Sequence, residues 1–196
     1  MRPVSLRTAR LVLDEPTPAD ADLVTAYCQD PLFERYLTTP WPYSRADADA
    51  FLGEFVPESW AIGSELTWAV RASEGGALLG MISVRPSDHA SGAWEIGYWM
   101  GTAHRGDGIM SEAAVAVSEW ALAGAIRGIT SLHWRAVEGN VASAKVARAA
   151  GFRRTRPDDP TVPARGGGTL PAWHAVRGRM TDPLAAESWT GILEPR

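Results

Sequence analysis

Short apolar runs alternate with amphipathic stretches along the chain, and their order predicts a mixed fold of strands and helices. Residues 10–17 read as a first strand. Residues 17–37 read as a helix that Thr17 caps and that Pro31 is expected to divide into two pieces. A second helix is predicted over residues 45–56.

The middle of the chain contains three strand-like runs in close succession. They cover residues 65–72, 77–86 and 93–100. The linkers between them are short and rich in turn-forming residues, which predicts an antiparallel meander.

The second half of the chain alternates helices with strands. We expect a helix that ends near Ala125, a strand at 131–138, a helix at 140–151, and two final strands at 152–155 and 172–178. Residues 156–170 are predicted to form a loop. The whole pattern predicts an α/β or α+β fold, with a mixed, mostly antiparallel sheet of six or seven strands and helices on both faces. One domain is expected over residues 1–180, followed by a tail at 181–196.

The sequence HRGDGIMSE at 104–112 precedes the helix with the clearest apolar stripe. Apolar residues at spacings of three and four form that stripe: Met110, Ala113, Ala114, Val117 and Ala121. The first turn of this helix must therefore lie at residues 106–110.

This helix start has the features of an anion site. Its first N–H groups have no acceptor within the helix and carry a partial positive charge. Gly106 and Gly108 would let a ligand oxygen approach the backbone, and Arg105 adds a fork of donors that suits a pyrophosphate. The alternative is a glycine-containing turn into a surface helix, in which Asp107 only complements the helix dipole.

Two other phosphate motifs fit less well. The chain contains no Walker A run. Gly106, Gly108 and Ser111 approximate a dinucleotide fingerprint, but that motif belongs to the first βαβ unit of a doubly wound sheet, and here it follows a meander.

Composition and charge narrow the class of protein. The 196 residues are 45% apolar and 21% charged, as in globular domains, and no apolar run is long enough to span a bilayer. The single cysteine, Cys28, excludes an intrachain disulfide, and the first residues lack the apolar core of a secretory signal, so a cytoplasmic location is expected.

The net charge of -4 argues against a nucleic-acid partner and suits a cationic or neutral substrate. The four histidines have no partners at metal-ligand spacing, so no metal is expected: His89, His104, His133 and His174.

Three segments resemble the GNAT superfamily of N-acetyltransferases. Residues 94–113, WEIGYWMGTAHRGDGIMSEA, resemble the run AEIGYWLxPxxRGxGxxxEA of that superfamily. Residues 7–24 resemble the first strand and helix of its Rim-type branch, whose members acetylate N-termini of ribosomal proteins. Residues 138–152 resemble the Asn-x-x-Ser helix of that branch, which ends in Gly-Phe. The likeness covers roughly residues 6–178 in the expected order.

The resemblance implies that acetyl-CoA lies in a splayed gap between the fourth and fifth strands, with its pyrophosphate on the N–H groups of residues 105–110. Cofactor contacts are accordingly expected at Trp99, Met100, Arg105, Gly106, Asp107, Gly108, Ile109, Met110 and Ser111. A backbone N–H near Met100 would polarise the thioester carbonyl. The family usually has Gly or Ala where Met110 stands, although a backbone N–H is still available there.

An amine must lose a proton before it attacks a thioester, because its pKa lies well above 7. In the strand 93–100, Glu95 alternates with apolar neighbours and shares a face with Gly97 and Trp99. The resemblance places the general base at Glu95, acting through a water. The alternative is an edge carboxylate on a solvated face.

The helix at 140–151 supplies three further candidates. Asn140 is a favoured N-cap, and the resemblance adds a hydrogen bond to pantetheine. Many GNAT enzymes use a tyrosine to protonate the leaving thiolate, but Ala147 stands at that position, so Ser143 is the expected substitute. Ala142, Val146 and Ala149 are expected to face the core. Lys145 matches a basic position that could reach the 3′-phosphate of CoA, or is a solvated surface lysine.

The loop at 38–44 matches in position the substrate-facing loop of the family. Trp41 and Tyr43 are therefore weak candidates for acceptor binding, or they pack beneath the loop. An exposed final strand would allow a homodimer.

The expected function is transfer of an acetyl group from acetyl-CoA to a primary amine by direct attack in a ternary complex. The acceptor is a protein N-terminus or a small-molecule amine, and no membrane partner is expected. The alternatives are an antibiotic or polyamine acetyltransferase, a transferase of a larger acyl group such as succinyl, and a CoA-binding sensor or scaffold without turnover.

Overall fold

The computed structural model describes residues 1–88, 90–156, 160–180 and 182–193. Backbone contacts divide the chain into two compact units, which are residues 1–85 with 97–113 and residues 86–96 with 114–196.

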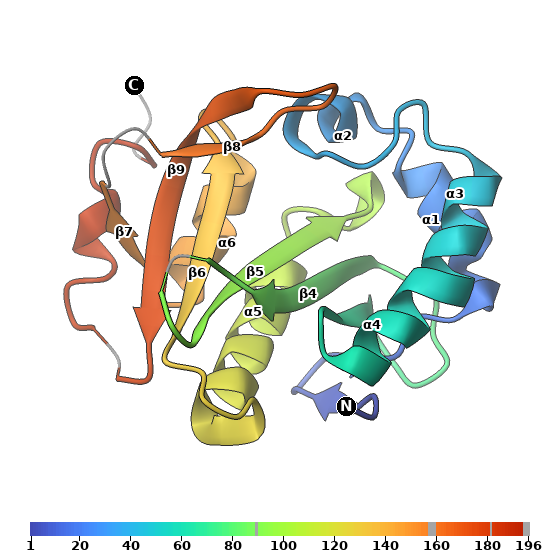
Figure 1. The fold of residues 1–196 in the computed structure, drawn as a ribbon, viewed down its shortest axis with the longest axis horizontal. Coiled ribbons are helices and arrows are strands. Elements are labelled where there is room, and N and C mark those ends of the chain that lie inside the picture. Colours follow the sequence, from blue (N-terminus) through green and yellow to red (C-terminus); the bar gives the residue numbers. More distant parts are fainter. Residues whose placement is uncertain (89, 157–159, 181, 194–196) are drawn as a thin grey trace. The chain divides into compact units, whose positions relative to one another are not determined.

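The sheet of the first unit is antiparallel over its first strands. Figure 1 labels β4 and β5. Its hydrogen-bonded order is β1 (Leu6–Arg7), β2 (Val12–Asp14), β3 (Leu66–Arg71) and β4 (Gly80–Pro86), followed by the second half of β5 (Ala93–Met100). The predicted meander and the bounds of β5 are confirmed. The first predicted strand, residues 10–17, is shorter than expected, because only Val12–Asp14 of it pairs with β3.

Capping residues set the helices of the first unit. Its helical segments are η1 (Pro18–Asp20), α1 (Ala21–Tyr27), α2 (Pro31–Tyr36), α3 (Arg45–Ala50), the π-helical η2 (Phe51–Phe55) and α4 (Val56–Ile62). Thr17 forms a capping box with Asp20, and Asp30 caps α2 at Pro31, so both predicted signals are confirmed. The helix predicted at 45–56 continues to Ile62, where left-handed Gly63 ends it.

A buried ion cluster joins β2, β3 and the start of the first helix. The Arg71 guanidinium donates to both carboxylate oxygens of Asp20, at 2.7 and 2.8 Å, and to Asp14 at 2.7 Å. Burial alone would raise the pKa of Asp20, but the hydrogen bonds from Arg71 and Thr17 outweigh it and hold that pKa below its usual value. The cluster therefore stays charged at neutral pH.

The second unit is built around β9. Its strands are the first half of β5, β6 (Ser131–Val137), β7 (Arg153–Thr155), β8 (Thr161–Pro163) and β9 (Thr169–Gly178). β6 pairs in parallel with Ala93–Glu95 of β5 and antiparallel with β9, while β7 and β8 also pair with β9. The helix α6 (Val141–Ala149) belongs to this unit. The helix α5 (Ile109–Trp120) begins in the first unit and continues here into the π-helical η4 (Ala121–Ala125). The predicted mixed, mostly antiparallel fold is confirmed.

Two predictions for this region are wrong. The expected loop at 156–170 contains β8 and the first residues of β9, which form a hairpin; its residues 157–159 lie outside the described part of the chain. The final strand is not an exposed edge, since β9 lies between β6 and β7. With β1 and β8, the described residues form nine strands, where six or seven were predicted. Both added strands have two or three residues, too few for an alternating pattern to show.

The segment after residue 180 packs onto the second unit through one tryptophan. Trp189, in η5 (Glu187–Trp189), is 1% exposed and meets Trp134 edge to face at a centroid distance of 5.6 Å. Its indole N–H donates to the Phe152 carbonyl at 2.8 Å. The described residues 182–193 are thus anchored in that core, while 181 and 194–196 lie outside the description.

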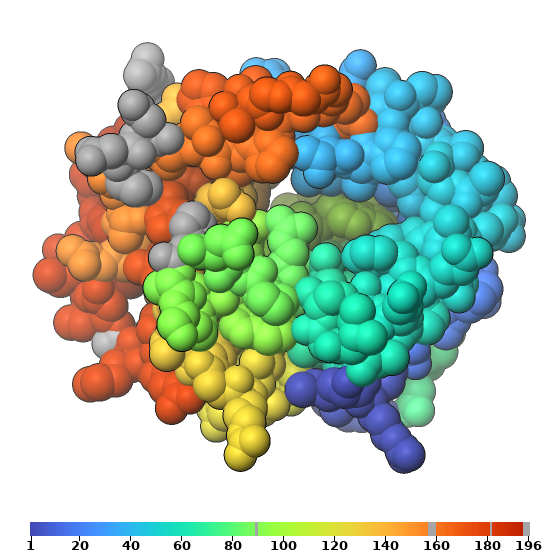
Figure 2. Space-filling view, in the orientation of Figure 1, coloured from blue at the N-terminus to red at the C-terminus, as the bar shows by residue number. Residues whose placement is uncertain are grey.

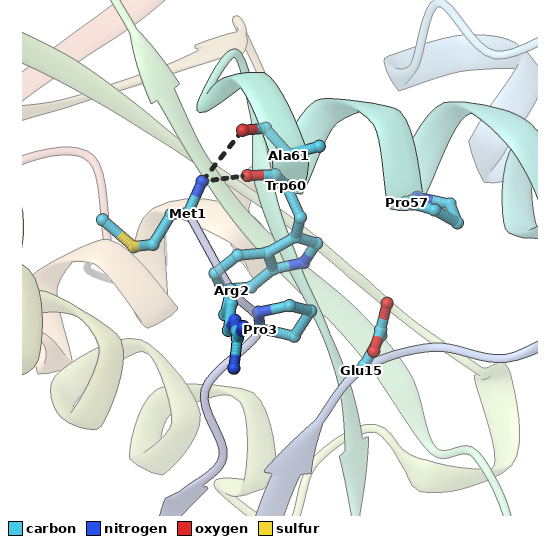
Figure 3. A pocket seen from close by; sticks show the side chains of 7 residues that line it. All are labelled: Met1, Arg2, Pro3, Glu15, Pro57, Trp60 and Ala61. Carbon is cyan, nitrogen blue, oxygen red and sulfur yellow. Dashed lines mark hydrogen bonds between the residues drawn. The ribbon is translucent and has the colours of Figure 1, made fainter.

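None of the helices that the structure describes is long and apolar enough to cross a bilayer. In the space-filling view, residues 45–62 of the first unit, cyan to teal, cover part of the visible surface (Figure 2). A pocket of about 500 Å³ lies at the end of that helix, where the Met1 ammonium donates to the carbonyls of Trp60 and Ala61 at 2.6 and 3.0 Å (Figure 3). This pocket contains none of the predicted site residues.

Candidate functional site

The loop between β5 and α5 holds its two central glycines in left-handed backbone conformations. The φ angles are 99° at Gly106 and 73° at Gly108. A Cβ at Gly106 would meet nothing within 4 Å, and one at Gly108 would meet only the Arg10 side chain at 3.9 Å. The backbone conformation therefore favours glycine at both positions, and the space above them is open.

The N-terminal turn of α5 faces that open space with unpaired donors. The Glu112 N–H donates to the Gly108 carbonyl at 3.0 Å, which marks the start of the helix. Within the described chain, no residue accepts a hydrogen bond from the N–H groups of Gly106, Asp107 or Gly108. Over the twelve residues of α5, the aligned peptide dipoles add a partial positive charge at this end. The loop therefore fits an anionic diphosphate.

Arg105 stabilises this loop through contacts with Met100 and Asp30. Its Nε and Nη2 donate to the Met100 carbonyl at 3.1 and 2.9 Å, and its Nη1 pairs with Asp30 at 2.7 Å. Burial would raise the pKa of Asp30, but hydrogen bonds from the Leu32 N–H, Thr102 and Arg105 hold it lower, so this pair stays ionised. Direct contact of Arg105 with a phosphate stays a prediction.

Arg10 lies against the same loop, although its sequence context carries no signal for this. Its guanidinium is 3.4 Å from the Asp107 carbonyl and pairs with Glu112 at 2.7 Å, and Glu112 also accepts from the Thr8 hydroxyl. These contacts join residues about a hundred positions apart, which local patterns do not connect. Arg10 places a second cation beside the glycines.

Met110 does not enter the loop. Its side chain is 6% exposed and belongs to the buried stripe of α5, whose members were predicted and are confirmed: Met110, Ala113, Ala114, Val117 and Ala121. Met110 is larger than the Gly or Ala usual in the family at this position, but its side chain does not fill the space beside the loop.

An aromatic cluster fixes the end of β5 in the first unit. Trp99 meets Phe33 and Tyr27 edge to face, at centroid distances of 5.6 and 6.3 Å. The Tyr27 hydroxyl bonds to His104 at 2.9 Å, and a Cβ at Gly101 would lie 2.8 Å from the Tyr27 ring. Glycine is therefore required at position 101 for close packing.

In the second unit, Glu95 forms an ion pair. Its Oε2 accepts from Arg135 Nε at 2.6 Å and Nη2 at 2.5 Å, and the Glu95 side chain is 11% exposed. A charge-assisted contact of this kind fixes the orientation of a carboxylate. Glu95 is therefore held in one place, as a positioned proton acceptor must be.

Further polar side chains lie on β6 and β9. Ser131, His133 and Arg135 alternate along β6, and His133 Nδ1 lies 3.0 Å from Nε2 of His174 on β9. His133 also bonds to Ser131, and His174 to Thr155. The alternation of polar residues in SLHWRAV was visible in the sequence, but the pairing with β9 needed the fold.

Asn140 caps α6, as predicted, with its side chain accepting from the Ser143 N–H at 3.2 Å. The Ser143 hydroxyl oxygen accepts from the Trp134 indole N–H at 3.1 Å. The predicted buried face of α6 is partly wrong, because Ala142 and Ala149 are exposed, whereas the residues against the core are Ala144, Ala147 and Ala150. An alanine-rich helix offers alanines on every face, so the pattern could not select among them.

Comparison with known proteins identifies the family. The sequence profile described as "Acetyltransferase (GNAT) domain" matches residues 10–153, more than half of the chain. This chain belongs to the GNAT acetyltransferase family. No curated protein sequence matches it.

Solved GNAT structures share the fold at low sequence identity. RimL, a ribosomal L7/L12 α-N-protein acetyltransferase in complex with coenzyme A, is 17% identical with a TM-score of 0.75, over 91% of this chain and all of RimL. RimJ of Mycobacterium smegmatis, in complex with CoA-disulfide, is 15% identical with a TM-score of 0.74, over 96% of each chain. The microcin C7 self-immunity acetyltransferase MccE, in complex with acetyl-CoA and AMP, is 18% identical with a TM-score of 0.71, over 87% of this chain and 93% of MccE.

The remaining predicted residues of this GNAT protein fall into two groups. Lys145 is exposed on α6, and its contact with CoA stays a prediction. Tyr43 is 7% exposed and Trp41 packs against the core of the first unit, so both lie partly beneath the loop that carries them. Among the described residues, no group of three or more His, Cys, Asp or Glu could hold a metal ion.

Replacing Gly108 by Asp is expected to weaken binding of coenzyme A about tenfold. A carboxylate placed a few ångströms from a diphosphate at the protein surface costs on the order of 1–2 kcal/mol. Gly108→Asn is the matched control, because Asn has the same shape and tolerates the same left-handed conformation without the charge. Calorimetry should give Asn an affinity within about threefold of the parent. Equal affinities for the Asp variant and the parent would exclude this loop as the diphosphate site.

Proposed function

We propose that this GNAT protein transfers the acetyl group of acetyl-CoA to the primary amine of a peptide N-terminus. The observation that carries this proposal is the open N-terminal turn of α5, with its two left-handed glycines and unpaired N–H groups. The similarity to Rim proteins favours a protein N-terminus as the acceptor.

In this proposal the first unit holds the coenzyme. N–H groups within residues 105–110 would bind the diphosphate, and Arg10 and Arg105, each paired with a carboxylate, would lie beside the same loop. Acetyl-CoA supplies an acyl group on a good leaving thiolate. Holding it in place is the larger contribution, since proximity can supply effective molarities of about 10⁵ to 10⁸ M.

Glu95 would receive the proton that the attacking amine loses, through a water. As the amine nitrogen bonds to the acyl carbon and the carbon–sulfur bond breaks, this proton must leave the nitrogen. The ion pair with Arg135 fixes the orientation of the Glu95 carboxylate. A positioned base of this kind is typically worth about 10² to 10⁴ in rate.

Ser143 would pass a proton to the departing thiolate, donating its hydroxyl hydrogen and recovering a proton from water, so that no alkoxide remains. Its hydrogen bond from Trp134 uses a lone pair of the hydroxyl oxygen and not its hydrogen. A thiol has a pKa near 8.5, by analogy with cysteine, so the thiolate leaves readily and this proton contributes less than the base.

The deciding experiment measures free thiol release from acetyl-CoA with a panel of amines. The panel contains peptides with free N-termini, a polyamine and an aminoglycoside, and coenzyme A affinity is measured alongside by calorimetry. Release with the peptides is expected, and no release when their N-termini are blocked. Tight coenzyme binding with no release for any amine would replace the proposal with a CoA sensor.

A further inference from the structure

A groove of about 480 Å³ lies wholly within the first unit. One wall is α1, and the other is the continuous helix formed by α3, η2 and α4. Tyr43, from the predicted acceptor loop at 38–44, and Trp99, from β5, also line the groove.

The floor of the groove is apolar. Val24 is 1% exposed, Cys28 2% and Tyr43 7%. Burial raises the pKa of the Cys28 thiol to about 12, so this cysteine is an inert part of the floor. Such a floor suits an aliphatic or aromatic side chain.

The rim of the groove is acidic. Asp47, Glu54 and Glu58 line it, whereas none of its lining residues in the described chain is Lys, Arg or His. Glu54 and Glu58 are exposed and have no ion-pair partner among the residues described. Hydrogen bonds from Ser44 hold the pKa of Asp47 below its usual value, so the third carboxylate is also charged.

The π-helical segment η2 shapes this rim. Such widened turns inside α-helices are frequent at functional sites. Here the wide turn carries Phe51, Glu54 and Phe55, all three of which line the groove. The Phe51 and Phe55 rings stack at 5.7 Å, and Phe55 remains 46% exposed. Aromatic faces beside carboxylates bind a cation with an apolar stem.

We propose that this groove selects basic acceptor peptides, taking an apolar side chain on its floor and an Arg or Lys of the same peptide against Glu54 and Glu58. This inference rests on the proposed acetyl transfer to a peptide. The inference adds to the proposed function a preference among peptides, which the coenzyme loop does not determine.

The test uses two peptide series with free N-termini that differ only in charge. One series carries Arg, and the other carries its neutral isostere citrulline, at each position from the second to the sixth in turn. For the parent protein, kcat/KM should be higher for Arg at one or two positions by about three- to tenfold, and the preference should shrink as salt is raised.

The variant with Glu54→Gln and Glu58→Gln should lose that preference and keep its rate with the citrulline peptides. The control variant, Glu119→Gln with Glu187→Gln, removes the same charge from residues outside the groove and should keep the preference. If both variants lost the preference for Arg peptides, the effect would come from net charge alone and the groove proposal would be overturned. The proposal would also be overturned if the parent protein preferred the citrulline peptides, or preferred a polyamine to every peptide.

Calorimetry with the Arg peptide that the parent binds most tightly separates this inference from the proposed function. If no acetyl transfer occurs, yet the parent binds that peptide and the Glu54→Gln, Glu58→Gln variant does not, the groove stands and the proposed function fails. If transfer is efficient but independent of peptide charge in both proteins, the function stands and the groove proposal is overturned.

Discussion

Replacing Glu95 by Gln should lower kcat about 10²- to 10⁴-fold, because the amide no longer accepts the proton that the amine must lose. Gln keeps the shape of Glu and an oxygen that can accept from Arg135, so the fold should survive. The residual rate should rise with pH, because more of the amine is already unprotonated near its own pKa of about 8. The pH optimum of thiol release is therefore expected to move upward.

Two measurements keep this prediction specific. Coenzyme A affinity should stay within about twofold of the parent, since Glu95 belongs to the chemistry and not to the diphosphate loop. Glu138→Gln removes an exposed carboxylate from the end of the neighbouring β6 and should leave kcat unchanged. A Glu95→Gln protein that turns over at the parental rate would remove Glu95 from the role of base.

Replacing Trp189 by Ala should destabilise the second unit by about 3–5 kcal/mol. The substitution empties a site next to Trp134 and leaves the Phe152 carbonyl without its indole donor. Urea unfolding followed by fluorescence would measure the loss as a lower midpoint.

Leu184→Ala is the control for that measurement, because Leu184 lies in the same segment and is 54% exposed. It should change the free energy of unfolding by less than about 0.5 kcal/mol. A Trp189→Ala protein as stable as the Leu184→Ala protein would show that the segment after residue 180 contributes nothing to the core.

The sequence predicted best those features that neighbouring residues determine. The bounds of β5, the caps at Thr17 and Asn140, the break at Pro31 and the buried stripe of α5 were all readable, because each depends on residues within one or two turns. The loop glycines belong to the same group, since a left-handed backbone is a local demand.

Features that depend on distant residues could not be read. No local pattern connects Arg10 with Glu112 or Arg135 with Glu95, although these pairs fix the charge of the site. β8 was not predicted, because Thr161–Pro163 has no apolar run and forms a strand only through its pairing with β9. The acidic groove escaped for the same reason, as its walls are separate helices and only the fold brings them together.

The central place of β9 in its unit has a consequence for synthesis. A nascent chain that has not yet reached Thr169 leaves one edge of β6 with open N–H and C=O groups, beside the apolar residues Leu132 and Trp134. At about 5–20 residues per second, the ribosome leaves that edge uncovered for a time on the order of seconds. During this interval, dilution or a chaperone must keep one unfinished chain from pairing with the next.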